Sequence, residues 1–213
     1  MKALGRLAVF LALALLAALP LAAQGSSAPG PGPEARQRCW GVDPKAPVLI
    51  EVYSDFMCPH CATLYLETMR PVLADYASQG KVCVAYYEFP FPRNQYSRPA
   101  SRYAVAASRL GAQKWVQVMD ALYYFQNDWA QTGALEPVLT KALSEKELAQ
   151  VKTWMKDPKL EAWIDRDVAE GKRRGVGSTP TLFITANGKT EKVAGAVQYP
   201  ILRRYLENLL AQR

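Results

Sequence analysis

Two cysteines separated by two residues stand out in this sequence of 213 residues. They are Cys58 and Cys61, and Pro59 and the only histidine of the chain, His60, lie between them. Two sulfurs at this spacing are typical of half a zinc site, of a structural disulfide, or of a reactive dithiol that exchanges disulfides. The surrounding sequence must distinguish these three chemistries.

The CPHC stretch follows a predicted buried strand and begins a predicted helix. Residues 47–56, PVLIEVYSDF, are rich in apolar and β-forming residues. Apolar residues then recur at three- and four-residue steps, which is typical of a helix, and Pro71 within this pattern predicts a kink. Cys58 would therefore lie at a helix N-terminus, where unpaired NH groups and the helix dipole stabilise a thiolate. Pro59 suits the first helical turn, because its missing NH costs nothing there.

His60 adds a hydrogen-bond donor or a positive charge close to the first sulfur. Such surroundings lower a cysteine pKa from about 8.5 to roughly 3.5–7.5, so we expect His60 to tune Cys58. A stabilised thiolate favours the reduced form, and the pair would then pass its disulfide to other proteins. A zinc site would need two more ligands, and the chain offers only Cys39, Cys83 and His60, without a second close pair. We therefore expect no metal and no organic cofactor, although a zinc site and a purely structural disulfide remain the alternatives.

The N-terminus has the pattern of an export signal. Lys2 and Arg6 precede an apolar run over residues 7–19, and small residues follow it. We predict a signal peptide over 1–25, with an uncleaved membrane anchor as the alternative. Residues 26–38 are rich in proline and glycine and predict a flexible tail.

The remaining residues, 39–213, suit one domain of ordinary size. The formal charge is +7, and removal of the two signal-peptide cations lowers it to +5. The one dense basic cluster, residues 172–174, ends a helical pattern, where cations favour the helix dipole. This mild excess without a basic and aromatic face argues against nucleic acid as a partner.

The element order predicts a mixed sheet with a helical insertion. A second strand is expected at 81–89, and helical spacing then continues over about 95–173. Strand patterns return at 179–184 and 190–195, around an Asn-Gly turn, and a closing helix ends the chain. Strand and helix alternation at the start predicts a parallel pair, and the final hairpin adds antiparallel strands.

Several motifs in this order resemble one known family. VYSDFMCPHC, the EFPF after the second strand, the helical insert, and GVGSTPTLFI followed by NGK are similar to DsbA-type thioredoxin-fold disulfide oxidoreductases of bacterial envelopes. The resemblance covers about residues 47–213. It implies an α/β thioredoxin fold with an all-helical insertion between the second strand and the cis-proline strand.

The resemblance also implies roles for individual residues. Cys58 would be the exposed nucleophile that forms a mixed disulfide with substrate, and Cys61 the buried partner that resolves it. Pro180 matches the family's cis-proline, and Thr179 beside it would pair with an extended substrate segment. The implied activity is donation of the CPHC disulfide to exported cysteine-containing proteins in the periplasm or outside the cell. A membrane-bound redox partner would reoxidise the protein, which we expect to be a monomer.

Proton handling departs from the family pattern. Members often carry an acid six positions before the first cysteine, and here that position is Val52. Glu51 is one residue away and should point to the opposite face of the strand. Proton transfer would then depend on Asp55, on water or on another group.

The second departure is an additional pair of cysteines. A bridge between Cys39 and Cys83 would enclose a loop of about 43 residues and stabilise the fold by roughly 4 kcal/mol. We predict this structural disulfide. The alternatives are a buried free thiol at Cys83 and a redox relay through Cys39.

Two other functions remain open from the sequence. One is a disulfide reductase or isomerase of the same fold, because residues around the cysteines tune the redox potential. The other is a non-catalytic module that binds unfolded chains or a metal ion.

Overall fold

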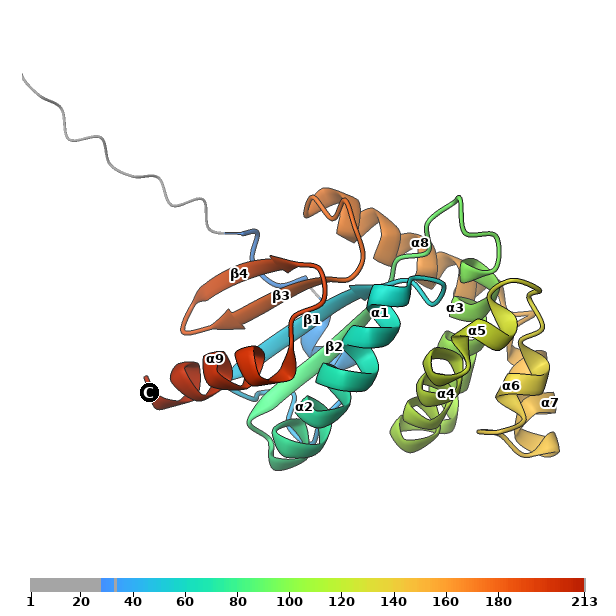
Figure 1. Cartoon of the computed structure of the whole chain (residues 1–213), viewed down its shortest axis with the longest axis horizontal. Coiled ribbons are helices and arrows are strands. Elements are labelled where there is room, and N and C mark those ends of the chain that lie inside the picture. The colour runs from blue at the N-terminus through green and yellow to red at the C-terminus, as the bar shows by residue number, and fades with distance from the viewer. Residues whose placement is uncertain (1–27, 33, 213) are drawn as a thin grey trace, which may run out of the picture.

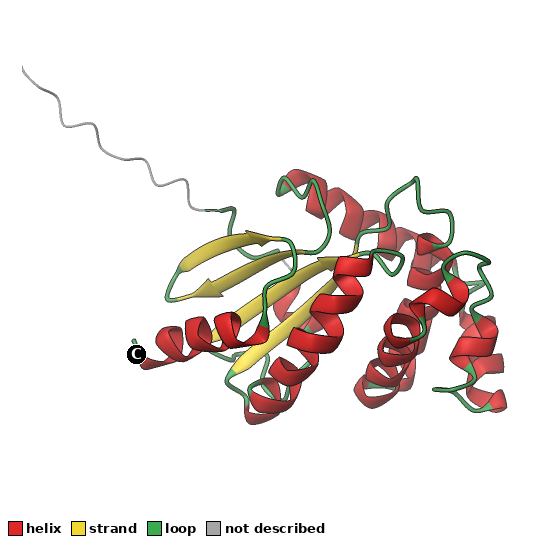
Figure 2. Cartoon of the chain, viewed as in Figure 1, coloured by secondary structure: helices red, strands yellow, loops and turns green. Residues whose placement is uncertain are grey.

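A four-stranded sheet with helices on both faces forms the centre of the structure (Figures 1 and 2). The structure is a computed structural model that describes residues 28–32 and 34–212. The predicted signal peptide, 1–25, lies outside the described residues. In the described part of the chain, no helix combines the length and the apolar character needed to cross a membrane.

The strand order is β2-β1-β3-β4. The strands are β1 (Val48–Ser54), β2 (Val82–Glu88), β3 (Thr181–Ala186) and β4 (Lys189–Ala194). β1 pairs in parallel with β2 and antiparallel with β3, and β3 pairs antiparallel with β4. The predicted parallel pair and C-terminal hairpin are therefore confirmed.

The helix after the CPHC stretch is modified where proline was expected to kink it. It runs as α1 (Pro59–Leu64), a π-helical segment (Tyr65–Met69) and α2 (Arg70–Asp75). Pro71 cannot donate to the carbonyl one turn earlier, and its ring would clash with that carbonyl in a regular α-helix. The wider π turn just before it relieves this conflict, and the helix continues instead of ending.

The predicted helical insertion lies between β2 and β3. It contains α3 (Ser97–Ala107), α4 (Ala112–Tyr124), α5 (Gln126–Trp129), α6 (Glu136–Leu139), α7 (Glu145–Trp154) and α8 (Pro158–Arg173). In Figure 1, α3 to α7 gather beside the end of the sheet at which β1 leads into α1. The fold class expected from the sequence is thus confirmed, and the insertion lies next to the CPHC stretch.

The two faces of the sheet have separate cores. α1, α2 and the closing helix α9 (Tyr199–Ala211) cover the face to which Val52 belongs, and Cys61 is buried in the same cluster. α8 and the N-terminal segment cover the other face, where Tyr53 and Phe183 are buried. Because side chains alternate along a strand, the identity of each strand residue decides which core it faces.

The N-terminal boundary of the domain differs from the expected one. The composition predicted a flexible tail over 26–38, but a 3₁₀ helix, Ala35–Arg38, packs on the domain. The guanidinium of Arg38 stacks on the rings of Tyr87 and Trp163, at 4.7 and 4.4 Å from the ring centres. Proline and glycine content alone does not reveal such a contact, in which a planar cation is held between aromatic rings.

Candidate active site

Cys58 occupies the N-cap position of α1, as the sequence predicted for a thiol at a helix start. Its backbone is extended, with φ −80° and ψ 119°, and Pro59 follows as the first helical residue. The backbone NH groups of Cys61 and Ala62 donate to the Cys58 carbonyl oxygen at 3.0 and 3.2 Å. Both Cys58 and Cys61 are free thiols, the first half-buried and the second 1% exposed. The structure therefore contains the reduced, dithiol form of the pair.

The pKa of Cys58 is lowered from its usual value to about 6. The largest cause is a hydrogen bond from the side chain of Cys61 to the Cys58 sulfur. Thr179 and the backbone NH groups of Cys61 and His60 lower the pKa further, whereas partial burial opposes the shift. At neutral pH this sulfur is therefore mostly a thiolate, which is the nucleophilic form.

The second sulfur has the opposite property. Burial raises the pKa of Cys61 well above its usual value, and the neighbouring Cys58 raises it further. The backbone NH of Asp55, 3.5 Å from the Cys61 sulfur, and the hydroxyl of Ser54 act in the other direction. The environments of the two thiols thus shift their pKa values in opposite directions. Such opposed shifts between neighbouring groups are common at functional sites.

The loop before β3 meets the first sulfur. The Thr179–Pro180 peptide bond is cis. The Cys58 sulfur lies 3.3 Å from the Thr179 carbonyl oxygen, to which it donates when it is protonated. Thr179 is half-buried and contacts Cys58 through this carbonyl oxygen, and Pro180, which follows it, is buried.

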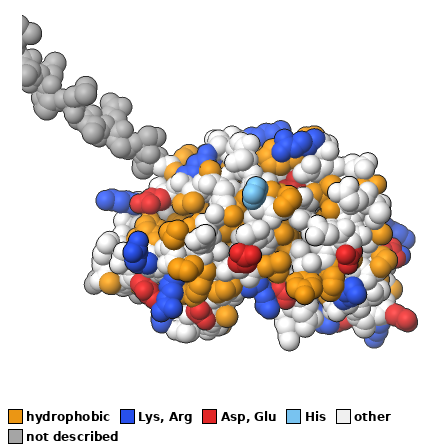
Figure 3. Space-filling view, viewed as in Figure 1, with side chains coloured by type: hydrophobic (Ala, Val, Ile, Leu, Met, Phe, Trp, Pro, Cys, Tyr) orange, Lys and Arg blue, Asp and Glu red, His pale blue; other side chains and the backbone are white. Residues whose placement is uncertain are grey.

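His60 lies at the surface, and its contribution to the Cys58 sulfur comes through its backbone. The side chain is exposed, and the pale-blue histidine is visible in Figure 3 with hydrophobic side chains near it. The contact that lowers the pKa of Cys58 is made by the His60 backbone NH. Its position at the helix start therefore matters in addition to its imidazole.

Asp55 ties the loop between β1 and α1 to the chain after β2. Its carboxylate accepts from the backbone NH groups of Met57 and Phe91 at 2.8 and 3.0 Å. It also accepts from the side chains of Asn94 and Ser97. Four donors on one buried carboxylate hold the loop to the chain after β2, so Asp55 is a structural anchor for the active-site loop.

Glu51 points away from the thiols, as strand alternation predicted. Its carboxylate forms a buried ion pair with Arg174 at 2.8 Å, and both side chains are 0% exposed. The pair lies on the α8 side of the sheet, opposite to Cys61. Val52 faces the Cys61 core, so the position that carries an acid in related proteins is apolar here.

Two contacts at the site were not predicted from the sequence. The amide of Gln126, in α5, donates to the carbonyl oxygens of Phe56 and Cys58 at 2.7 and 3.1 Å. The hydroxyls of Ser54 and Tyr123 are 2.6 Å apart on the Cys61 side of the sheet. Each contact joins the insertion to residues about 70 positions earlier, at the end of β1 or in the loop that follows it. The strand pattern predicted that Ser54 is buried, but it did not predict either contact.

The other two cysteines are joined away from the dithiol. Cys39 and Cys83 form a disulfide with a Cα–Cα distance of 5.2 Å. Beside it, Trp40 pairs with Val84 of β2 through a backbone hydrogen bond of 2.7 Å. Within residues 28–32 and 34–212, no group of three or more His, Cys, Asp or Glu residues is arranged to hold a metal ion.

A comparison with protein families decides the classification. The thioredoxin family model matches residues 36–208. The chain belongs to the thioredoxin family. Among curated relatives of this thioredoxin-family protein is the probable disulfide bond formation protein D of Bacillus cereus, 20% identical over 146 residues and 67% of each chain.

Solved structures place the thioredoxin-family chain in the DsbA-type fold. α-DsbA1 of Wolbachia pipientis superposes with a TM-score of 0.70 at 20% identity, covering 85% of this chain and 94% of that one. Oxidised BdbD of Bacillus subtilis gives 0.64 at 15% identity, covering 87% and 98%. The DsbA-type fold that the motifs predicted, with its helical insertion, is thereby confirmed.

Proposed function

We propose that this protein is an oxidase that donates its Cys58–Cys61 disulfide to exported proteins during their folding. The observation that carries the proposal is the contrast between the two sulfurs, since the pKa of Cys58 is lowered to about 6 while that of Cys61 is raised. A thiolate that is stable when released favours the reduced form of the enzyme. The disulfide of such an enzyme is readily given to other proteins.

The reaction consists of two thiolate exchanges. A substrate thiolate attacks the Cys58 sulfur, which breaks the Cys58–Cys61 bond and forms a mixed disulfide, and Cys61 leaves. A second substrate thiolate then attacks the substrate sulfur of the mixed disulfide, and Cys58 leaves as a thiolate. Two electrons pass from the substrate to the enzyme, and no metal or organic cofactor takes part.

The surface around the first sulfur suits an extended polypeptide. Cys58 is half-buried, so an incoming thiolate can reach it, and the Thr179 carbonyl oxygen is 3.3 Å from its sulfur. In this proposal Thr179 and Pro180 bind the substrate backbone, and Pro59 and His60 hold and tune the nucleophile. The exposed hydrophobic side chains near the histidine in Figure 3 favour unfolded chains over folded ones.

The location of the protein and its redox partner are also part of this proposal. The N-terminal pattern supports export to the periplasm or the medium, with residues 1–25 removed. A structural neighbour from Salmonella enterica is described as a periplasmic thioredoxin-like protein, at 20% identity and a TM-score of 0.55. A membrane-bound redox partner would reoxidise the monomer, and the Cys39–Cys83 disulfide would have a structural role.

The decisive experiment is an equilibrium titration of the Cys58–Cys61 pair in glutathione buffers, combined with an assay of oxidation in a reduced model protein. We expect a potential far more oxidising than the thioredoxin value of about −270 mV. A potential near that value would contradict the oxidase proposal and favour a reductase. Recovery of a scrambled disulfide protein beyond simple oxidation would instead indicate an isomerase.

Two variants separate enzyme from binding module. Cys61→Ser, mixed with a disulfide-containing substrate protein, is expected to accumulate a mixed disulfide visible on non-reducing gels. The Cys58 thiolate attacks the substrate disulfide and releases one substrate thiolate, and the resolving sulfur is absent. Cys58→Ser is expected to form no adduct and to lose oxidation. If Cys58→Ser assists refolding as well as the unmodified protein, the protein acts as a binding module.

A further inference from the structure

The thiol chemistry requires proton exchange at a sulfur that solvent does not reach. Cys61 leaves as a thiolate when substrate is oxidised, and it must lose its proton again when the enzyme is reoxidised. It is 1% exposed, and burial raises its pKa. A group on the same face of the sheet must therefore give and take this proton.

Asp55 is a poor candidate although it is close to Cys61. Its carboxylate accepts from four donors, so its oxygens are already engaged in holding the active-site loop. Glu51 lies on the opposite face of the sheet in its ion pair with Arg174. Val52 has no ionisable group.

Glu88 has the position that the other acids lack. It ends β2, and in the parallel register its neighbour on β1 is Ser54. Partners in neighbouring strands are about 4.8 Å apart and share a face, so Glu88 lies on the Cys61 side of the sheet, next to Ser54. Ser54 contacts the Cys61 sulfur and the Tyr123 hydroxyl. Hydroxyl groups thus connect the neighbourhood of Glu88 with the buried thiol.

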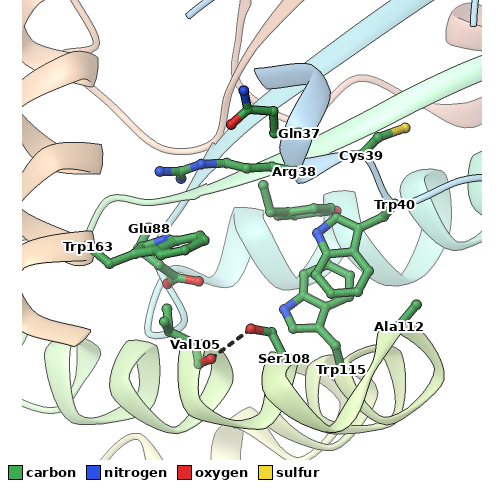
Figure 4. Close-up of a pocket in the computed structure, with 11 residues that line it drawn as sticks. Gln37, Arg38, Cys39, Trp40, Glu88, Val105, Ser108, Ala112, Trp115 and Trp163 are labelled. Atoms are coloured by element: carbon green, nitrogen blue, oxygen red, sulfur yellow. Dashed lines mark hydrogen bonds between the residues drawn. The ribbon is translucent and has the colours of Figure 1, made fainter. Parts of the chain in front are cut away.

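Glu88 is buried, yet it lines a cavity that opens to the surface. The cavity has a volume of about 210 Å³ and is shown in Figure 4. Its walls include Arg38, Trp115 and Trp163, and the buried hydroxyl of Tyr86 also belongs to its lining. This volume is large enough to hold several water molecules among polar groups. Water in this cavity can exchange protons between Glu88 and the solvent.

We propose that Glu88 is the proton-exchanging positioning residue for Cys61, acting through Ser54 and Tyr123 and recharged by water in the cavity of Figure 4. This inference rests on the proposed thiol exchange. When substrate is oxidised, the Glu88 carboxylic acid supplies a proton to the Cys61 thiolate. When the enzyme is reoxidised by a disulfide, the Glu88 carboxylate takes the Cys61 proton, and Cys61 attacks the Cys58 sulfur.

The charges around Glu88 are consistent with a group that changes protonation near neutral pH. Burial raises the pKa of Glu88 to about 8, and the hydrogen bond from Ser101, at 2.6 Å, opposes this shift. Asp167 of α8 and Asp55 raise it further, whereas Arg38 lowers it. From α4, Tyr123 faces the same space, and its pKa is raised well above the usual range, so it stays a neutral hydroxyl.

The test follows the reaction of reduced protein with oxidised glutathione in a single turnover. Cys58 first attacks glutathione disulfide, which forms a Cys58–glutathione mixed disulfide and releases one glutathione thiolate. Cys61 then attacks the Cys58 sulfur, which releases the second. Acid quenching and mass spectrometry measure both steps separately. In the unmodified protein we expect the second step to accelerate as the pH rises through about 8.

Glu88→Gln preserves the size of the side chain but cannot take a proton. We expect the first step to stay within about twofold and the second to slow by about 10²-fold, with loss of its pH dependence near 8. Glu51→Gln is the matched control, because it alters a buried acid on the neighbouring strand and the other face. It should lower stability without slowing the second step. Both variants are compared at a temperature at which circular dichroism shows them folded.

Ser101→Ala gives an independent readout if Glu88→Gln does not fold. It removes the hydrogen bond that lowers the pKa of Glu88, so the acceleration should move to higher pH. An unchanged second step in Glu88→Gln, or an unmoved pH profile in Ser101→Ala, would overturn the role of Glu88. Absence of any mixed disulfide in the unmodified protein would instead contradict the proposed function.

Discussion

The sulfur of Cys58 lies 3.3 Å from the carbonyl oxygen of Thr179, although the two residues are 121 positions apart in the chain. One residue begins α1 and the other precedes β3, so the sheet brings together a helix start and a loop that the insertion separates. A substrate strand lying along Thr179 would present its own cysteine next to this sulfur. In the proposed function, this contact would link the sulfur that is attacked with the residue that binds the substrate backbone.

The reactivity of Cys58 should follow its lowered pKa. We expect its alkylation by iodoacetamide to increase with pH around a midpoint of about 6. Cys61→Ala removes the largest cause of the shift, so its midpoint should move toward the ordinary value of about 8.5. A midpoint near 8.5 in the unmodified protein would contradict the thiolate described here.

The same shift makes the stability of the reduced protein depend on pH. The folded protein binds the Cys58 proton more weakly than the unfolded chain does. The stabilising contribution is therefore complete above the unfolded pKa of about 8.5, and it is lost as the pH falls through about 6. Thermal unfolding of the reduced protein and of Cys58→Ser should differ at high pH and converge below about 6. A difference that grows toward acid pH would have the wrong sign.

The disulfide between Cys39 and Cys83 should contribute to stability and not to exchange. We expect the double variant Cys39→Ala/Cys83→Ala to lose about 4 kcal/mol of unfolding free energy in urea, because the unfolded chain loses a constraint. Removal of the CPHC pair, which closes only a two-residue loop, serves as the comparison and should cost less. Loss of glutathione exchange in the first variant would support a redox relay through Cys39.

Gln126 should rigidify the active-site loop from the insertion. Gln126→Leu leaves two carbonyl oxygens without this donor, and we expect about 1–3 kcal/mol of lost stability. Hydrogen exchange around Phe56 and Cys58 should accelerate. Gln131→Leu, at an exposed position in the same part of the insertion, is the control and should change neither measurement.

Arg174 should be far more important for stability than its neighbour. Arg174→Gln leaves the Glu51 carboxylate buried without its cation, and we expect a loss of about 3–5 kcal/mol. Arg173→Gln breaks a surface pair with Glu170 and should have little effect on stability, because solvent screens exposed pairs. If chemical denaturation gave equal losses of unfolding free energy for the two variants, the buried pair would not be more important for stability than the surface pair.

Local patterns were sufficient for the elements and for the dithiol. The strand after Pro47 and the hairpin around Asn187 follow from residue type and alternation, which depend on neighbours in the chain. The position of Cys58 at the helix start follows from the same kind of local information. Strand alternation also placed Glu51 on the face away from Cys61.

Contacts over long sequence distances could not be predicted from these patterns. Nothing local distinguishes Gln126 from other glutamines, because its role depends on where the insertion returns to the loop. Glu88 ends an apolar strand, and its charge alone favours a solvent-facing position. In the structure α3 and α8 cover it. The folded turn that contains Arg38 was missed because its stability comes from rings contributed by β2 and α8.

The bridge from Cys39 to Cys83 encloses both cysteines of the CPHC stretch. A chain that emerges from its N-terminus exposes Cys58 and Cys61 before Cys83, so pairing in order of appearance would join the wrong sulfurs. In the native structure Trp40 pairs with Val84 of β2, which holds Cys39 next to Cys83. The correct pairing of the four cysteines is therefore specified by the folded sheet and not by their order along the chain.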